Sequence, residues 1–277
     1  MNKNHFDQHI HSAFSCDSKP ENTIGHIAES AISAGLSGIA ITDHFDPLWP
    51  DETPFGDFEY FELDIPAYQA ALTEAENIYS DRILFSKGIE LGLLSGKAND
   101  KCLKVVRGFP YDFVIGSVHY SETTPIDYTP FHEGRLLPDI LDEYYGIIID
   151  SIKEFKDYDV LGHINSIDRY TDELAPGSLY MSYIDEIIKL VISDGKGIEI
   201  NTCSYGRYYR PGEYGTPTLA ILKRFRELGG EIVTIGSDAH KTEDVGAFIE
   251  KGEDLLHSAG FKYQAVFKER KPEFCKI

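Results

Sequence analysis

Basic residues are scarce in this 277-residue sequence. It has 26 Lys+Arg against 46 Asp+Glu, which gives a formal net charge of −20 at pH 7. Proteins that bind the backbone of DNA or RNA usually present a broad basic face, so this balance argues against a nucleic-acid partner. A small anionic substrate is still compatible with it, because the charge inside a site can differ from the net charge.

Cysteine and long apolar runs are scarce as well. The four cysteines, Cys16, Cys102, Cys203 and Cys275, form no CxxC pair, which favours free thiols in a reducing compartment. The first residues, MNKNHFDQHIH, lack the apolar segment of a signal peptide. No run approaches the roughly 20 apolar residues that cross a bilayer. We therefore expect a cytoplasmic protein without a membrane partner.

Short apolar runs do recur along the chain, and longer amphipathic segments separate them. Four of the runs are apolar at consecutive positions, as in parallel strands that are buried on both faces. The predicted strands are residues 5–11, 38–43, 83–91, 111–119, 159–163, 197–201 and 231–237. The predicted helices are residues 22–34, 64–79, 140–155, 183–192, 216–228 and 245–258.

This alternation of strands and helices predicts an α/β fold with a parallel sheet and right-handed crossovers. A closed barrel fits the length better than two domains, and no linker or change of composition divides the chain. We therefore expect one domain over residues 1–277. Two Pro-rich, irregular stretches, residues 45–61 and 121–138, follow strands and are expected to form substrate loops.

Six of the ten histidines lie at or just after the end of a predicted strand, and three carboxylates occupy equivalent places. The carboxyl ends of barrel strands meet at one face, so these side chains are expected to converge. A lone histidine there is usually a satisfied polar group, but nine potential ligands together predict a metal centre. They are His9, His11, Asp17, His44, Glu90, His119, His163, Asp238 and His240.

Nine nitrogen and oxygen ligands are too many for one ion, since a catalytic zinc uses three protein ligands and a water. The set predicts two to three divalent ions, drawn from Zn, Fe and Mn, with a bridging carboxylate. Multinuclear centres of this kind activate water and stabilise phosphoryl displacement. We therefore expect a hydrolase, with Glu90, Asp238 and His240 among the catalytic residues.

The motifs that carry these ligands follow a recognisable order. They are HIH at 9–11, TDH at 42–44, GIE at 88–90, GSVH at 116–119, GHIN at 162–165 and GSDAH at 236–240. In this the chain resembles the PHP (polymerase and histidinol phosphatase) family over almost its whole length. The resemblance implies a distorted (β/α)7 barrel, similar to a TIM barrel, with a trinuclear metal site.

The resemblance also implies how the ligands are shared. His9, His11, Glu90 and Asp238 would hold the first ion. Glu90 would bridge to a second ion, which His119 and His163 would also hold. Asp17, His44 and His240 would hold the third. Many members of the family have His where this sequence has Asp17, a departure that bears on the identity of the third metal.

Within the family, the chain most resembles the monofunctional histidinol-phosphate phosphatases. These enzymes use arginines just beyond strand ends to bind the substrate phosphate, which implies that role for Arg169 and Arg207, with Arg210 as a substitute. Guanidinium binds phosphate as a bidentate fork. The implied reaction is hydrolysis of L-histidinol phosphate to L-histidinol and phosphate in histidine biosynthesis, with a small phosphomonoester as the only partner.

Other functions are also compatible with the pattern. One is another PHP phosphoesterase: a nucleotide phosphatase, a phosphodiesterase or an exonuclease. A second is an amidohydrolase, which would require a bridging lysine on a middle strand, where Lys87 precedes Glu90. A third is a metal-loaded binding protein without turnover. The sequence leaves the metal identities and the oligomeric state open, and it offers Asp43 or Tyr120 as a proton donor to the leaving group.

Overall fold

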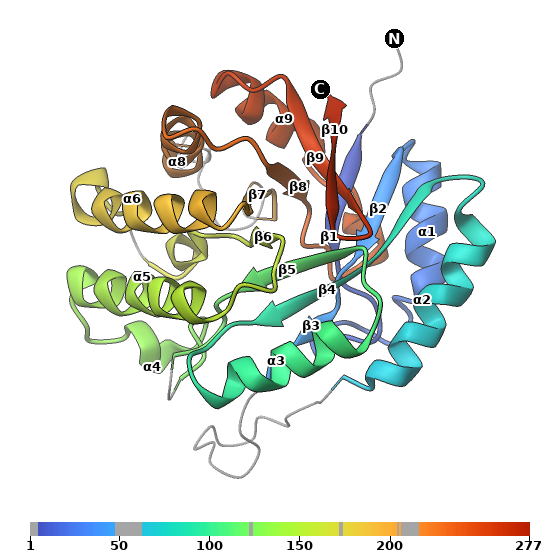
Figure 1. Ribbon diagram of the computed structural model, residues 1–277, viewed down its shortest axis with the longest axis horizontal. Helices are drawn as coiled ribbons and strands as arrows, with labels where there is room; N and C mark the ends of the chain where they lie inside the picture. Colours follow the sequence, from blue (N-terminus) through green and yellow to red (C-terminus); the bar gives the residue numbers. More distant parts are fainter. Residues whose placement is uncertain (1–4, 48–62, 122–123, 172–173, 204, 206–215) are drawn as a thin grey trace.

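The computed structural model describes residues 5–47, 63–121, 124–171, 174–203, 205 and 216–277. Within these residues, seven parallel strands follow one another around a nearly closed barrel, and helices surround it (Figure 1). They are β1 (Phe6–Ile10), β2 (Gly38–Ile41), β4 (Leu84–Gly92), β5 (Phe113–Ser117), β6 (Val160–Leu161), β7 (Gly197–Asn201) and β8 (Val233–Gly236). The short strand β3 (His44–Phe45) continues the line of β2 and also pairs with β4. The expected barrel is confirmed.

The helices occupy the connections between the strands. They are α1 (Ile24–Ser33), α2 (Ile65–Tyr79), α3 (Lys97–Gly108), α4 (Thr129–His132), α5 (Leu137–Glu154), α6 (Gly177–Ser193), α8 (Thr216–Glu227) and α9 (Ile249–Ser258), with 3-10 turns η1 (Ser166–Arg169) and η2 (Thr242–Asp244). Helix α3 was not predicted, because it buries few apolar side chains. The irregular stretch at 121–138 contains α4, and the stretch at 45–61 lies mostly outside the described residues.

Local sequence explains where several of these helices begin. Thr23 precedes α1, and its side chain accepts a hydrogen bond from the backbone N–H of His26. Asp64 does the same for α2 through the N–H of Ala67. Such N-caps satisfy backbone donors that have no partner within the helix. None of the described helices is both long and apolar enough to cross a membrane.

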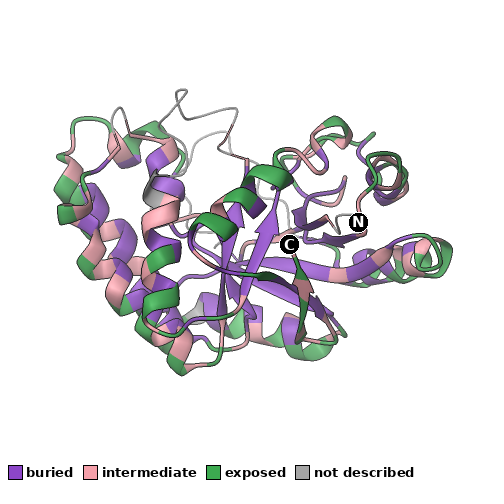
Figure 2. Cartoon of the chain, turned by 90° about the horizontal axis from the view of Figure 1, so that it is seen from above, coloured by how far each residue is buried: buried purple, intermediate pink, exposed green. Residues whose placement is uncertain are grey.

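Burial on both faces holds the barrel strands in place. Every residue of β1, β2, β5, β7 and β8 is buried. Alternate residues face opposite ways: Ala40 and Phe113 belong to a cluster inside the barrel, whereas Ile39 and Val114 pack in the larger core under the helices. Figure 2 shows this buried centre inside helices whose outer faces are exposed. Full burial of a Val, Ile or Phe side chain contributes roughly 1.5–3 kcal/mol.

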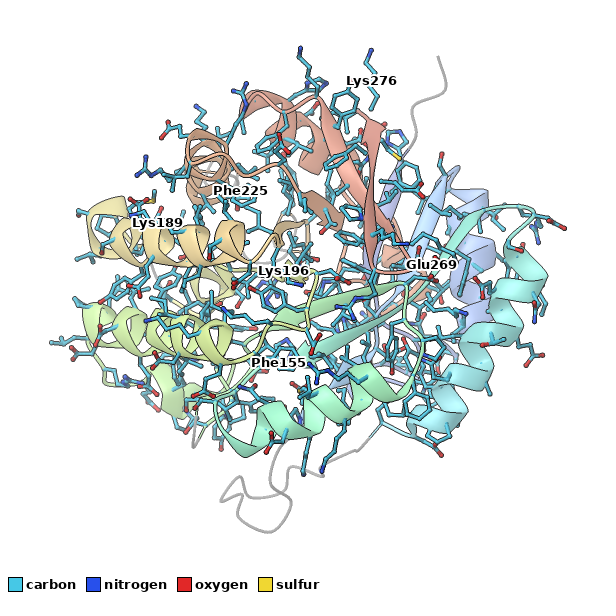
Figure 3. The ribbon with its side chains drawn as sticks, in the orientation of Figure 1. Phe155, Lys189, Lys196, Phe225, Glu269 and Lys276 are labelled. Atoms are coloured by element: carbon cyan, nitrogen blue, oxygen red, sulfur yellow. The ribbon has the colours of Figure 1, made fainter. Side chains whose placement is uncertain are left out.

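A hairpin that the sequence analysis did not predict fills the amino-terminal end of the barrel. It consists of β9 (Tyr263–Lys268) and β10 (Lys271–Lys276). Phe267 from β9 enters the interior cluster, where its ring stacks on that of Phe113 with 4.9 Å between the centroids. Figure 3 shows Glu269 at the turn of this hairpin and Lys276 at its far end. The barrel is therefore closed at the end away from the strand termini that carry the histidines.

The barrel closes between β8 and β1 through a short seam. The backbone N–H of Asp238 donates to the carbonyl of His9 at 2.8 Å, and that of His11 donates to Ala239 at 2.9 Å. Further down the seam, the buried carboxylate of Asp7 accepts hydrogen bonds from the N–H of Ser237 at 2.8 Å and from its hydroxyl at 2.6 Å. The seam thus joins the two segments that carry four of the predicted ligands.

Candidate metal centre

The structure brings all nine predicted ligands together at the carboxyl end of the barrel. Most of them lie at or just after the carboxyl end of a parallel strand, which places them at the mouth of the barrel, and Asp17 lies in the loop that follows β1. Asp238 also has a left-handed backbone conformation, with φ of 55°, so the chain turns sharply after β8. Asp accepts this conformation more readily than most residues.

Four of the side chains form a first group around two imidazole nitrogens. The Nε2 atoms of His9 and His11 lie 3.0 Å apart. Glu90 Oε2 lies 3.2 Å from that of His9 and 3.5 Å from that of His11. Asp238 Oδ1 lies 3.3 Å from His11 Nε2. Tetrahedral ligands at 2.0–2.2 Å from an ion are about 3.3–3.6 Å apart, so the spacing fits a divalent metal.

A second group uses the other oxygen of the same carboxylate. Glu90 Oε1 lies 3.0 Å from His163 Nε2 and 3.2 Å from His119 Nε2. Glu90 is completely buried, and its two oxygens face the two groups separately. The side chain is therefore placed as a bridge between neighbouring ions would be.

A third group lies nearer the solvent. Asp17 Oδ2 is 2.9 Å from His240 Nε2 and 3.6 Å from His44 Nε2. His44 also approaches the first group, since its Nδ1 lies 2.9 Å from Glu90 Oε2. Among the residues that the structure describes, three sets of donor atoms are compact enough to hold an ion, with all atoms of a set within 4.8 Å. They are His9, His11 and Glu90; His11, His44 and His240; and His44, Glu90 and His119.

The donor set fits divalent cations in its contacts as well as in its spacing. Glu90 Oε2 and His44 Nδ1 are buried and close together, yet neither is in hydrogen-bonding geometry. Buried polar atoms almost always have a hydrogen-bond partner, so such crowding without hydrogen bonds requires another explanation. Nitrogen and oxygen atoms that point at a common centre are what a Zn, Fe or Mn ion requires.

Electrostatics in the centre keep the carboxylates ionised. Burial raises the pKa of Glu90, but the imidazoles of His9, His119 and His44 hold that pKa well below its usual range. For His119 the reverse holds: burial lowers its pKa, but the carboxylates of Asp46 and Glu90 raise it to about 10. Protons on the imidazoles and divalent cations are therefore alternative ways to balance the same negative charge.

Sequence reasoning missed residues that orient the ligands. Glu199 Oε1 accepts a hydrogen bond from His9 Nδ1 at 2.6 Å, and Asp46 Oδ1 lies 2.9 Å from His119 Nδ1. Metal-binding histidines usually donate their second ring N–H in this way. Gly236 leaves the room required, since a Cβ there would lie 2.2 Å from the Cβ of His9. The signal for Glu199 was a single charged residue within the apolar strand GIEIN.

Arg169, one of the two predicted phosphate-binding arginines, lies at the edge of the centre. It ends η1, and its Nη1 donates to Asp238 Oδ2 at 3.3 Å. Its Nη2 donates to Asn201 Oδ1 at 2.8 Å. Arg207 and Arg210 lie outside the described residues.

A cavity of about 460 Å³ opens beside the centre. It is large enough for a small molecule, though it is at the lower end of the usual range. It is lined by Cys16, Asp17, His44, Asp46, Val118, His119, Tyr120, Ile126, Asp127, His163, Ser166, Arg169, Tyr170, Cys203, Asp238, His240 and Lys241.

These contacts argue against two alternatives from the sequence: Asp43 as the proton donor, and an amidohydrolase site with Lys87. Asp43 is not directed into the cavity as a proton donor: it is completely buried, and it accepts hydrogen bonds from the N–H and hydroxyl of Ser12 and from the hydroxyl of Ser15. Lys87 does not bridge ligands as an amidohydrolase lysine would, because its Nζ pairs with Glu76 at 2.8 Å.

A sequence profile of the PHP domain matches residues 7–203, well over half of the chain. This chain belongs to the PHP domain family. The predicted family is thereby confirmed, and the PHP match includes seven of the nine predicted ligands.

Individual relatives agree with the family match. The histidinol-phosphatase of Lactococcus lactis subsp. lactis is 29% identical over 269 residues, which cover 96% of this chain and 95% of that protein. A crystal structure of histidinol phosphate phosphatase from the same organism, complexed with Zn, L-histidinol and phosphate, superposes with a TM-score of 0.85 at 28% identity and covers 97% of this chain and 98% of that one. A Listeria monocytogenes structure, with a TM-score of 0.73 at 18% identity, covers 89% of this chain and 99% of that one and supports the fold alone.

Proposed function

We propose that this protein is a metal-dependent phosphomonoester hydrolase that converts L-histidinol phosphate and water into L-histidinol and phosphate. The observation that carries the proposal is the convergence of nine metal-type donors at one end of the barrel, where six of them and Arg169 line a single cavity. The barrel that holds them matches, over 97% of the chain, a protein crystallised with zinc, L-histidinol and phosphate.

We assign the ligands as three sets. His9, His11, Glu90 and Asp238 would hold one ion, and Glu90 would reach a second ion with His119 and His163. Asp17, His44 and His240 would hold a third. Zinc is supported by the related crystal structure, and a site of imidazoles and carboxylates also accepts Fe or Mn. Bound ions would lower the pKa of water towards roughly 7 and offset charge on the phosphate.

The side chains of the centre would have separate roles in the proposed hydrolysis. Glu90 fixes the spacing of two ligand groups, because each of its oxygens faces one of them. His240 is oriented by its own segment: its Nδ1 donates to the carbonyl of Asp238 at 2.9 Å, which turns Nε2 towards Asp17. Asp238 connects the first group to Arg169. These contacts support catalytic roles for Glu90, Asp238 and His240.

Arg169 is placed to bind the phosphate group. It lines the cavity, and its guanidinium is held at one edge by Asp238 and Asn201. A planar guanidinium can donate to two phosphate oxygens at once and compensate charge that develops during transfer. We assign Arg207 the same task on the strength of the family resemblance.

The leaving alcohol and the organic part of the substrate would lie against other residues that line the cavity. Tyr120 lines the cavity, and burial raises its pKa, so its hydroxyl keeps its proton at neutral pH. Asp127 lines it too, brought there by the hydrogen bond from the N–H of Ile126 to the carbonyl of His119 at 2.8 Å. A carboxylate in this position suits the ammonium group of histidinol.

We further propose that residues 1–277 form one domain and that the protein acts in the cytoplasm, in histidine biosynthesis, on a small molecule and without nucleic acid or membrane. The four cysteines are all unbridged, which supports a reducing compartment. The net charge of −20 supports a partner other than a nucleic-acid polymer.

The test combines metal analysis with a substrate panel. Purified protein is analysed for Zn, Fe and Mn, and phosphate release is measured for L-histidinol phosphate, p-nitrophenyl phosphate, a mononucleotide and bis(p-nitrophenyl) phosphate. We expect bound metal and the highest kcat/KM for L-histidinol phosphate. Equal or faster turnover of the diester would contradict the assignment and favour a phosphodiesterase, and a preferred mononucleotide would favour a nucleotide phosphatase.

A further inference from the structure

Two polar side chains on β7 connect the ligand groups of the metal centre with Arg169. Glu199 and Asn201 are two residues apart on this strand, so they face the same side, whereas the alternate residues Ile198 and Ile200 pack into the core under the helices. Both polar residues are buried. A buried carboxylate and amide in an apolar strand are costly unless their hydrogen bonds are satisfied.

Glu199 contacts one ligand from each of two groups. Its Oε1 accepts from His9 Nδ1 at 2.6 Å, and its Oε2 accepts from the backbone N–H of His163 at 2.9 Å. His9 belongs to the first group, and His163 belongs to the second. One carboxylate therefore fixes the ring orientation of His9 and the backbone position of His163.

Asn201 continues the connection outward. Its Nδ2 donates to Glu199 Oε2 at 3.2 Å and to Asp238 Oδ2 at 3.1 Å. Its Oδ1 accepts from Arg169 Nη2 at 2.8 Å and from the N–H of Cys203 at 3.1 Å. Two acceptors on one side and two donors on the other match an amide, whose NH2 group has two donors and whose oxygen accepts twice. An Asp at this position would bring a third carboxylate against Glu199 and Asp238.

We infer that Glu199 and Asn201 are positioning residues that couple phosphate binding by Arg169 to metal binding by His9 and Asp238. The inference rests on the proposed function for the role of Arg169. Asn201 holds Asp238 by its Oδ2, which leaves Oδ1 directed at His11. The same amide holds Nη2 of Arg169, whose side chain lines the cavity. A substitution that alters phosphate binding by Arg169 should therefore also alter metal binding by Asp238, and the reverse.

The first test is a double-mutant cycle of Arg169→Ala and Asn201→Ala. The dissociation constant of inorganic phosphate is measured by calorimetry on the zinc-loaded proteins, so the result does not depend on turnover. Asn201→Ala should weaken phosphate binding on the order of tenfold when Arg169 is present, and less than about twofold when Arg169 is already replaced. Equal losses in both backgrounds would overturn the coupling. Asn201→Ser serves as a second variant if Asn201→Ala does not fold.

The second test addresses the metal side of the connection. Glu199→Gln keeps the size of the side chain but offers an amide N–H to the backbone N–H of His163. Zinc affinity, measured by competition with a chromophoric chelator, should fall about 10–100-fold. Excess zinc should still bring the occupancy of the sites towards saturation. The matched control is Ser86→Ala, which removes a buried hydroxyl that donates to the carbonyl of Phe267 at the opposite end of the barrel.

Outcomes for the coupling and for the proposed function can be told apart. Unchanged zinc affinity in Glu199→Gln, or a loss no larger than in Ser86→Ala, would remove Glu199 from the positioning role. If the coupling is measured for phosphate and zinc but no phosphomonoester is hydrolysed, the coupling stands and the proposed function fails. If L-histidinol phosphate is hydrolysed but the cycle is additive, the proposed function stands and the coupling fails.

Discussion

The two ends of the barrel hold their charges in opposite ways. At the amino-terminal end, charges are matched within the chain: Lys268 Nζ lies 2.7 Å from Glu76 and 2.9 Å from Asp112, and Arg270 pairs with Asp159. At the carboxyl end, carboxylates and imidazoles crowd together. Strand β4 shows both arrangements. Lys87 pairs with Glu76, whereas Glu90, three residues further along, lies among the imidazoles of four histidines.

This contrast separates a structural end from a functional one. The ion pairs at the amino-terminal end neutralise each other within the chain, so they need no ion from solution. The crowded end keeps its carboxylates negative through neighbouring imidazoles, which must lose their protons before they can bind a cation. The two ends therefore differ in whether added metal, phosphate or acid should affect them.

Removal of metal should give the largest difference between the two ends. Exhaustive dialysis against a chelator should lower kcat/KM more than about a thousandfold, because water activation and charge compensation are lost together. It should also lower Tm, since ions that bind only the folded chain stabilise it. Readdition of Zn, Mn or Fe should restore both. Lys268→Ala should show the same metal-dependent change in Tm, and a chelator-resistant activity would contradict the metal centre.

The substitution Glu90→Gln should give the second-largest loss of activity. The amide cannot supply two anionic oxygens, so two ligand groups lose their shared carboxylate, and kcat should fall about a thousandfold with less bound metal. Elemental analysis and steady-state kinetics measure the two effects. Glu76→Gln is the matched control, because it removes a paired carboxylate at the opposite end and should leave kcat within about twofold. A similar loss of kcat in both variants would contradict the functional difference between the two ends of the barrel.

Arg169→Ala should act mainly on phosphate binding. Loss of charge-assisted hydrogen bonds is worth about 1.5–3 kcal/mol, which corresponds to a rise in KM of roughly 10–150-fold for L-histidinol phosphate. Metal content at saturating zinc should stay unchanged. Arg270→Ala provides the control, since this arginine pairs with Asp159 away from the cavity. A KM unchanged by Arg169→Ala would place the phosphate elsewhere.

Acid should weaken metal binding at the carboxyl end. The pKa of His119 is raised to about 10 by Asp46 and Glu90 despite its burial, so at pH 7 this ring must release a proton when it binds a cation. The apparent zinc affinity should therefore rise by up to about tenfold per pH unit between pH 6 and 8. Calorimetry in two buffers of different ionisation enthalpy measures the proton release. A release of zero would contradict the direction of this shift.

Lys268→Ala should give the smallest effect and confine it to stability. The side chain is about one-third exposed, with 35% of its surface accessible, so its two ion pairs are partly screened. We expect a loss of roughly 0.5–1 kcal/mol in the free energy of unfolding, read from denaturant titration, and an unchanged kcat/KM. A loss of activity would show that the two ends are coupled through the barrel.

The sequence predicted the carboxyl end better than the other end, for a physical reason. Parallel strands bring their carboxyl ends together, so residues such as His44 and His163 could be placed from strand position alone. Glu199 was missed because one acidic residue in an apolar strand does not reveal its partner. The hairpin was missed because its polar residues resemble exposed surface, and only packing shows that Phe267 enters the barrel.

The seam between β1 and β8 has a consequence for synthesis of the chain. Asp7 and Ser237 are separated by 230 positions, so β1 cannot gain this neighbour until nearly the whole barrel has left the ribosome. At ordinary translation rates that interval is roughly 10–50 s. During it, His9 and His11 are present without Asp238. A nascent chain could therefore acquire its full complement of metal only once the segment that carries Asp238 has been synthesised and has met β1.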